Sequence, residues 1–189
     1  MSEIGKITKI VEKRLSPLRF RHSLGVADKA RRLAERFGID EEKAYLAGIV
    51  HDYAKGIAGS ELLNIAKENG LIDDEVYREV PDLLHAPVGA FLIEKELGID
   101  DKEILSAVRK HTLGDLDMGL FDKIIFLADM VEPGRDFPGI ERLRCLVERN
   151  LDEAMLFALE STLRYCMDTG RIIHPQTVKV RNHFLKILK

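Results

Sequence analysis

The side chains with the clearest potential for chemistry in this chain are the pair His51-Asp52 and the single residues His22 and Asp129. The pair lies in GIVHDYAKG, His22 in RFRHSLGVA and Asp129 in IIFLADMVEP. All three segments have an apolar, helical pattern, in which a titratable side chain is costly without a partner. Two imidazoles and two carboxylates can hold a hard or borderline metal ion and leave positions open for water and substrate. We therefore predict a metal site.

Each of these four residues also has an ordinary explanation. A single histidine in a helix is usually packed or solvated, and a buried aspartate is more often a helix cap or part of an ion pair. Jointly, the four favour a divalent metal. Nitrogen and oxygen ligands without a thiolate suit iron, manganese or magnesium better than structural zinc. The ligand types leave the choice among iron, manganese and magnesium open, and the number of ions (one or two) stays open as well.

Two further histidines close apolar helical stretches. His85 lies in DLLHAPVGA and His111 in AVRKHTLGD. They could bind a second metal, contact phosphate oxygens or act as a general acid. For His111, an exposed position favoured by the helix dipole is a reasonable alternative. We expect the catalytic group to consist of these two residues together with His51 and Asp52.

Basic residues occur in step with the proposed ligands. Arg19 precedes His22 by three residues and Lys55 follows Asp52 by three, a spacing that places each on the same helical face as its ligand. Cations aimed at a metal site are what a hydrolase of phosphoesters or phosphoanhydrides needs. Arg135, in the loop EPGRDFPG, could add another cation. Most of the 29 basic residues should be solvated, and spacing distinguishes only Arg19 and Lys55 from them.

The segment TGRIIHPQTVKV is a weaker candidate. Gly170 permits a tight or left-handed backbone, and Pro175 is suited to the start of a helix. Free backbone N–H groups there could receive a phosphate or a base edge. Without other information, a connection between two helices is the preferred interpretation.

Composition narrows the class of protein. The chain has 189 residues, 46% of them apolar, which is enough for one globular domain over residues 1–189. With 29 basic and 32 acidic residues, it does not favour nucleic acid or an anionic membrane as its main partner. It has no signal-peptide core and no 18-residue apolar run. Cys145 and Cys166 fit no zinc spacing, so we expect free thiols in a core, which suits a reducing cytoplasm.

Helix start and stop signals recur along the whole chain, with no convincing strand, repeat or linker, and they predict one all-α domain. The expected helices begin after Ser2, run from Pro17 to Gly38, from a cap at Asp40 to near Gly56, between Ser60 and Gly70, from Asp82 to Leu97 with a break or start at Pro87, from a cap at Asp100 to His111, from Leu120 to Val131, over about 139–149 and 151–168, and onward from Pro175.

The motifs together resemble a known family. RFRHSLGVA, LAGIVHDYAKG, LLHAPVGA, VRKHTLG, LADMVEPGRDFPG and TGRIIHPQTV are similar to segments of the YqeK family of HD-domain symmetrical bis(5'-nucleosyl)-tetraphosphatases. The resemblance implies a helical HD-domain bundle that hydrolyses diadenosine tetraphosphate to two ADP. It also implies an iron-type metal at His22, His51, Asp52 and Asp129, with manganese as the alternative, and a cytoplasmic location. Some members of the family are dimers, so a homodimer is one expectation for this chain.

The resemblance further implies a set of nucleotide contacts, namely Arg19, Lys55, Gly56, Ile57, Ala58, His85, His111, Thr112, Asp129, Arg135, Ile172, Ile173, His174, Pro175, Gln176 and Thr177. Two alternatives remain open. One is an HD-domain phosphohydrolase that acts on another nucleotide, although the length argues against the multidomain guanosine-polyphosphate enzymes and no HHE…GYP signature is present. The other is a nucleotide-sensing HD module without activity.

Overall fold

The computed structural model describes residues 2–189 and confirms the all-α class, since no strand occurs in that range. Met1, part of the predicted domain, lies outside the described residues. The helices are α1 (Glu3–Arg14), α2 (Pro17–Phe37), α3 (Glu41–Val50), α4 (Gly59–Glu68), α5 (Val76–Glu79), the short 3₁₀ helix η1 (Pro81–Leu84), α6 (His85–Leu97), α7 (Lys102–Lys110), α8 (Leu120–Val131), α9 (Ile140–Val147), α10 (Leu151–Asp168) and α11 (Pro175–Ile187).

Side-chain caps start the first three helices as predicted. The side chains of Ser2, Ser16 and Asp40 accept hydrogen bonds from the backbone N–H groups three residues later. Each bond satisfies one of the N–H groups that a helix start leaves without a partner. Gly38 ends α2 with a φ of 68°, the left-handed conformation that glycine adopts without strain.

The predicted end of α3 near Gly56 is wrong. The helix ends at Val50, and the chain continues through tight turns, in which Lys55 N–H bonds to the Asp52 carbonyl at 2.8 Å and Ile57 N–H to the Ala54 carbonyl at 3.1 Å. Bonds across three residues wind the chain more tightly than an α-helix. The apolar pattern could not distinguish these turns from a continued helix.

Other boundaries shift slightly. Ser60 lies inside α4, because that helix begins at Gly59. The cap of α7 is Asp101 and not Asp100, since the Asp101 carboxylate accepts bonds from the first turn of the helix. Pro87 lies in the first turn of α6, which agrees with the expectation that a new helix starts there. A proline is tolerated at that position because it has no intrahelical bond to lose. The short α5 was not predicted.

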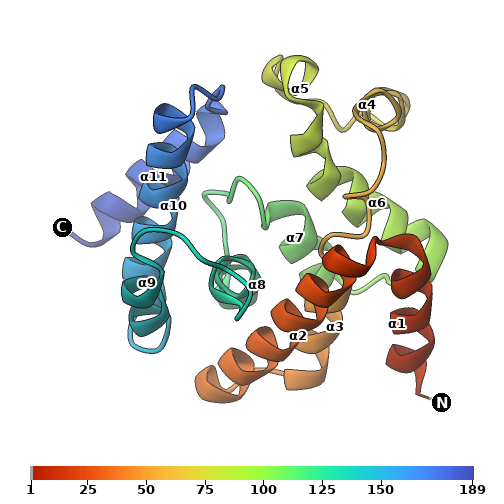
Figure 1. Cartoon of the computed structure of the whole chain (residues 1–189), viewed down its shortest axis with the longest axis horizontal. Coiled ribbons are helices and arrows are strands. Elements are labelled where there is room, and N and C mark those ends of the chain that lie inside the picture. Colours follow the sequence, from red (N-terminus) through yellow and green to blue (C-terminus); the bar gives the residue numbers. More distant parts are fainter. Residues whose placement is uncertain (1) are drawn as a thin grey trace.

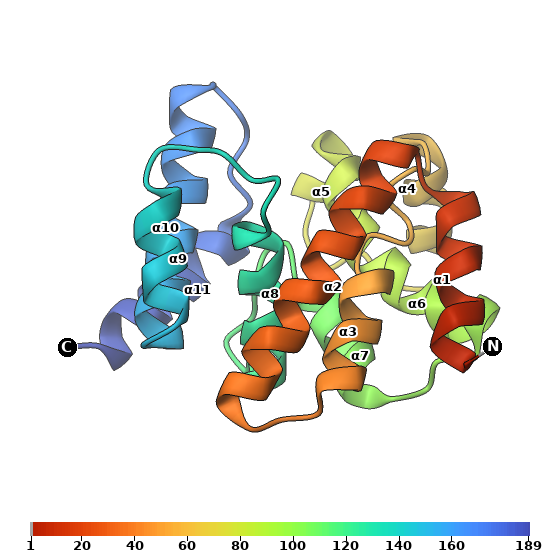
Figure 2. The same cartoon turned by 60° about the horizontal axis from the view of Figure 1, so that its bottom comes forward.

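Helix α8 is the central element of the core. It packs against α2, α3 and α7 on one side and against α9 and α10 on the other, so that it lies between the C-terminal helices and the rest of the chain (Figures 1 and 2). Its side chains Ile124, Ile125 and Leu127 are fully buried. Because α8 is fixed on both sides, the polar residues at its C-terminal end have a defined place.

Helices α2 and α3 make the closest contact of this core. A Cβ on Gly48 would lie 2.5 Å from Cα of Ala27 and 2.7 Å from its backbone nitrogen, so only glycine fits at this crossing. The approach brings the rings of His22 and His51 to a centroid distance of 5.2 Å. Glycine at position 48 therefore contributes directly to the assembly of the site.

The two cysteines lie nearer the surface than predicted. The expectation that both thiols lie in a core is wrong, because Cys145 is exposed on α9 and Cys166 is only half-buried on α10. Within residues 2–189, every helix is too short or too polar to cross a lipid bilayer.

Candidate metal centre

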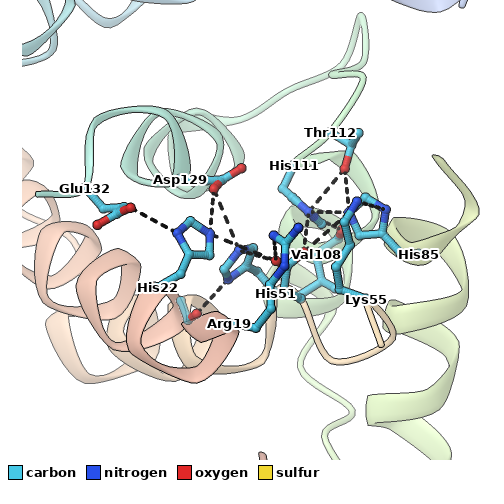
Figure 3. Close-up of polar contacts among 12 residues, drawn as sticks. Arg19, His22, His51, Lys55, His85, Val108, His111, Thr112, Asp129 and Glu132 are labelled. Atoms are coloured by element: carbon cyan, nitrogen blue, oxygen red, sulfur yellow. Dashed lines mark hydrogen bonds and ion pairs between the residues drawn. The ribbon is translucent and has the colours of Figure 1, made fainter. Parts of the chain in front are cut away.

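The structure brings the four predicted ligands together. His22 projects from α2, His51 from the turn after α3 and Asp129 from α8 (Figure 3). Asp52 follows His51 in the same turn. The Nε2 atom of His22 lies 2.9 Å from Oδ1 of Asp129. The Nε2 atom of His51 lies 3.7 Å from Oδ2 of Asp52 and 3.9 Å from Oδ1 of Asp129. One imidazole or carboxylate atom from each of three segments thus converges on one point.

The tautomer of His51 shows what this point can hold. Its Nδ1 atom lies 2.8 Å from the carbonyl oxygen of Gly48 and must donate to it. The lone pair of the neutral ring is therefore on Nε2, which is buried and has no hydrogen-bond partner. A lone pair directed at the carboxylates of Asp52 and Asp129 is repulsive unless a cation lies between them. The donor set fits a divalent metal ion.

The charge states agree with this interpretation. Burial lowers the pKa of His51 to about 4, so its ring is neutral near pH 7, as a ligand must be. Burial alone would raise the pKa of Asp129, but its hydrogen bond to His22 and the guanidinium of Arg135 hold that pKa well below its usual range. Burial lowers the pKa of His22, but its contacts with Asp129 and Glu132 together outweigh this effect and the net shift is upward.

A second cluster adjoins the first. His85 and His111 each direct Nδ1 at a backbone carbonyl, so both Nε2 atoms carry lone pairs, and these two atoms lie 3.1 Å apart. They lie 3.5 and 3.7 Å from Oδ1 of Asp52. Because the other oxygen of Asp52, Oδ2, faces His22 and His51, this carboxylate is shared by both clusters. Burial, with His111 and Lys55 nearby, lowers the pKa of His85 to about 3.

The three predicted cations surround these clusters. Arg19 Nη1 lies 3.2 Å from Oδ2 of Asp52. Arg135 pairs with the Asp129 carboxylate and also donates from Nε to the Asp129 carbonyl at 2.8 Å. Lys55 Nζ lies 3.2 Å from Nδ1 of His85, and burial lowers the pKa of this lysine. All three lie at the edge of the centre.

The remaining predicted nucleotide contacts fall into three groups. Thr112 belongs to the centre, because its hydroxyl lies 3.1 Å from Nε2 of both His85 and His111. Gly56, Ile57 and Ala58 form the loop that leads into α4.

The segment from Ile172 to Thr177 lies apart from the centre. Within residues 2–189, none of its members forms a hydrogen bond with the four proposed ligands. The segment includes Ile173 and Pro175, and His174 caps α11 by accepting from Gln176 N–H at 3.2 Å. His174 and Gln176 line a cavity of about 430 Å³ that also includes Tyr77, Pro87 and Leu113. The cavity lies near the second histidine cluster in sequence, since Pro87 is two residues after His85 and Leu113 directly follows Thr112.

One residue of the centre was missed by sequence reasoning. Glu132 follows Asp129 by three residues, and its Oε1 atom lies 3.1 Å from Nδ1 of His22 (Figure 3). The signal was present, because Arg19 and Lys55 were recognised by the same spacing of three.

This arrangement of paired histidines and aspartates on a helical bundle agrees with comparisons to known proteins. Residues 19–134 match the HD domain family, and the chain belongs to it. A solved structure from Clostridium acetobutylicum, described as a predicted HD superfamily hydrolase involved in NAD metabolism, is 38% identical. It covers 98% of each chain with a TM-score of 0.93.

Relatives with curated names define the subgroup. A protein from Bacillus subtilis is 39% identical over 173 residues, which cover 91% of this chain and 92% of the relative. One from Halalkalibacterium halodurans is 38% identical over 181 residues, 96% of either chain. Both are named symmetrical bis(5'-nucleosyl)-tetraphosphatases, and this chain belongs to their family. The resemblance stated from the sequence motifs is thereby confirmed.

Proposed function

We propose that the protein hydrolyses diadenosine tetraphosphate symmetrically and releases two molecules of ADP. The observation that carries the proposal is the buried, unpartnered Nε2 of His51 beside the carboxylates of Asp52 and Asp129. This donor set calls for a divalent cation, and three basic side chains surround it. The names of the relatives, which cover nearly the whole chain, support the choice of substrate.

The proposed ion is iron, held by His22, His51, Asp52 and Asp129. Nitrogen and oxygen donors without thiolate support iron or manganese over structural zinc. When bound, such an ion supplies Lewis-acid activation of water and of phosphate oxygens.

The chain's own residues would position the substrate. Arg19, Lys55 and Arg135 would offset the negative charge of the polyphosphate. Because they lie around the centre, they support cleavage of a bond near the middle of the polyphosphate chain. Segment 172–177 with its adjoining cavity would receive one nucleoside. Fixing one ADP half in this way, with the other half extending beyond the centre, is what a symmetrical cut requires.

The pair His85 and His111 has two candidate roles. Their facing lone pairs, beside Oδ1 of Asp52, could hold a second ion. Alternatively, a proton bound at one Nε2 could be donated to the phosphate oxygen that leaves. The metal content of His111→Gln separates these roles: a fall from two ions per chain to one supports the second ion, and an unchanged content of one with slower turnover supports the proton.

The experiment for the main proposal combines metal analysis with product analysis. Protein purified without oxygen is assayed for bound iron and manganese and then supplied with a panel of mononucleotides and dinucleoside polyphosphates. ADP as the sole product from diadenosine tetraphosphate is the expected result. ATP and AMP as products would contradict the symmetrical cut, and nucleotide binding without turnover in metal-loaded protein would favour a sensing module instead.

A further inference from the structure

Glu132 is a buried carboxylate that is neither a proposed metal ligand nor a proposed substrate contact. It follows the last residue of α8 and is 6% exposed. A buried carboxylate is costly unless partners compensate for its lost hydration. Its two oxygens have different partners. Oε1 lies 3.1 Å from Nδ1 of His22, and Oε2 accepts the backbone N–H of Gly134 at 2.6 Å.

The space around this carboxylate is closed by two glycines. A Cβ on Gly25 would lie 2.8 Å from Oε2 of Glu132, and a Cβ on Gly134 would lie 2.9 Å from Oε1. Gly25 is in α2, less than one turn after His22, in the middle of a helix where glycine is otherwise unfavourable. The two glycines therefore leave room for the carboxylate in the one place from which it reaches the imidazole.

The backbone that carries Glu132 is also held in place. The guanidinium of Arg144, from α9, donates from Nη2 to the carbonyl oxygens of Glu132 at 3.3 Å and of Arg135 at 3.0 Å. These bonds brace the turn after α8. The same turn thus directs a carboxylate at His22 and a guanidinium at Asp129.

We propose that Glu132 is a positioning residue for the metal centre. By accepting from Nδ1, it fixes the ring orientation of His22 and leaves Nε2 as the atom that faces the ion. Gly25 is part of the same device, because its missing side chain allows the carboxylate to approach. The inference rests on the proposed metal site and names a residue of that site's support that is not itself a ligand.

The test measures metal affinity and not activity. Metal-stripped protein is titrated with Mn²⁺ or Co²⁺ against a chromophoric chelator, for wild type, Glu132→Ala, Glu132→Gln and Gly25→Ala. Loss of such a carboxylate–histidine contact typically weakens metal binding by about 10- to 100-fold. We expect that loss for Glu132→Ala, and a smaller loss for Glu132→Gln, which keeps an acceptor oxygen.

Gly25→Ala is the decisive variant because Glu132 remains present. The added methyl group displaces only the far end of the Glu132 side chain, and alanine is a better helix former than glycine, so the chain should fold. We expect weaker metal binding with a retained thermal midpoint of the metal-free protein. Gly89→Ala is the matched control, since its Cβ would meet its neighbours at ordinary distances of 3.7 and 3.8 Å, and it should bind as wild type does.

Three results would overturn the inference. Folded Glu132→Ala with wild-type affinity would exclude the positioning role directly. If Glu132→Ala does not fold, wild-type affinity in Gly25→Ala decides against the role. If wild-type protein binds neither ion, the proposed metal site is wrong and this inference fails with it. This outcome differs from a failure of the positioning role alone, in which wild-type protein binds the ion and the variants bind it equally well.

Discussion

At the scale of single residues, Asp52 is the side chain that connects the two histidine clusters. One of its oxygens faces His22 and His51, and the other faces His85 and His111. Because both oxygens of Asp52 face histidines, an amide cannot replace this carboxylate, since an amide has only one acceptor oxygen and no charge.

Asp52→Asn should therefore remove bound metal and activity together. Because loss of an outer contact already costs about 10- to 100-fold, loss of this shared ligand should lower both metal affinity and turnover by more than about 100-fold. Elemental analysis and product assays on the same sample check this. Asp117→Asn is the control, since Asp117 pairs with Lys110 at an exposed position. Retained turnover in metal-free Asp52→Asn would refute a metal-dependent reaction.

The buried histidines predict how the stability of the metal-free protein depends on pH. Burial lowers the pKa of His51 to about 4 and that of His85 to about 3, from an ordinary value of 6.5. As the pH falls below about 6.5, the unfolded chain takes up protons that the folded chain does not bind, so stability is lost progressively towards pH 4. His22, whose pKa is raised because Asp129 and Glu132 together outweigh burial, offsets part of this loss.

We expect the metal-free protein to lose on the order of a few kcal/mol between pH 7 and pH 4.5, measured by urea unfolding. His85→Gln should show a shallower dependence, because one of the groups that titrates only in the unfolded state is gone. A slope in His85→Gln equal to that of wild type would show that this residue is not responsible.

The four ligands could be predicted from the sequence because each interrupts an apolar segment, where a buried titratable group is costly without a partner. The spacing of three relates Glu132 to Asp129, but the pairing of Glu132 with His22 could not be derived from the sequence. Glu132 is 110 residues away from it, and only the docking of α2 on α8 joins the two. The contribution of segment 172–177 came from family resemblance alone, and its role as a nucleotide contact stays a prediction.

At the scale of elements, the close crossing of α2 and α3 sets the distance between two of the ligands. Gly48→Ala places a methyl group against the backbone of Ala27, which cannot move aside as a flexible side chain does. We expect destabilisation of about 1–3 kcal/mol or more, measured by urea unfolding. Gly89→Ala, also in a packed helix, should be nearly neutral. A Gly48→Ala variant as stable as wild type would show that the crossing tolerates separation.

Helix starts were easier to predict than helix ends. Caps such as Ser16 and Asp40 act through local hydrogen bonds that the sequence displays directly. The end of α3 depends instead on the bond of the His51 ring to the Gly48 carbonyl and on the turns that follow. These turns satisfy the same apolar pattern as a helix, and they let two consecutive side chains face the centre.

At the scale of the whole molecule, the centre is assembled from α2, the turn after α3 and α8, with the second histidine cluster at α6 and the end of α7. That residues 1–189 form one domain stays a prediction, as does dimerisation. The contacts of α8 with α2, α3, α9 and α10 support a single cooperative unit.

Metal loading should therefore stabilise the entire fold. An ion that binds only the folded chain adds about 2.7 kcal/mol at a free concentration 100 times its Kd. For a chain of this size, each kcal/mol raises the Tm by about 2–4 °C. Calorimetry of stripped and reloaded protein measures the shift, which Asp129→Asn should abolish. An unchanged Tm on loading of the wild-type protein would show that the ion does not bind at the folded centre.

The origin of the ligands in α2, α3 and α8 also bears on the time course of unfolding. The centre is complete only when these three segments have docked, so we expect an ion to gain most of its contacts late, after the folding transition state. Stabilisation that arises late slows the escape from the native state and leaves the forward rate nearly unchanged. In stopped-flow measurements, metal should shift the unfolding limb of the chevron plot and spare the refolding limb, so that the loaded protein is long-lived as well as stable.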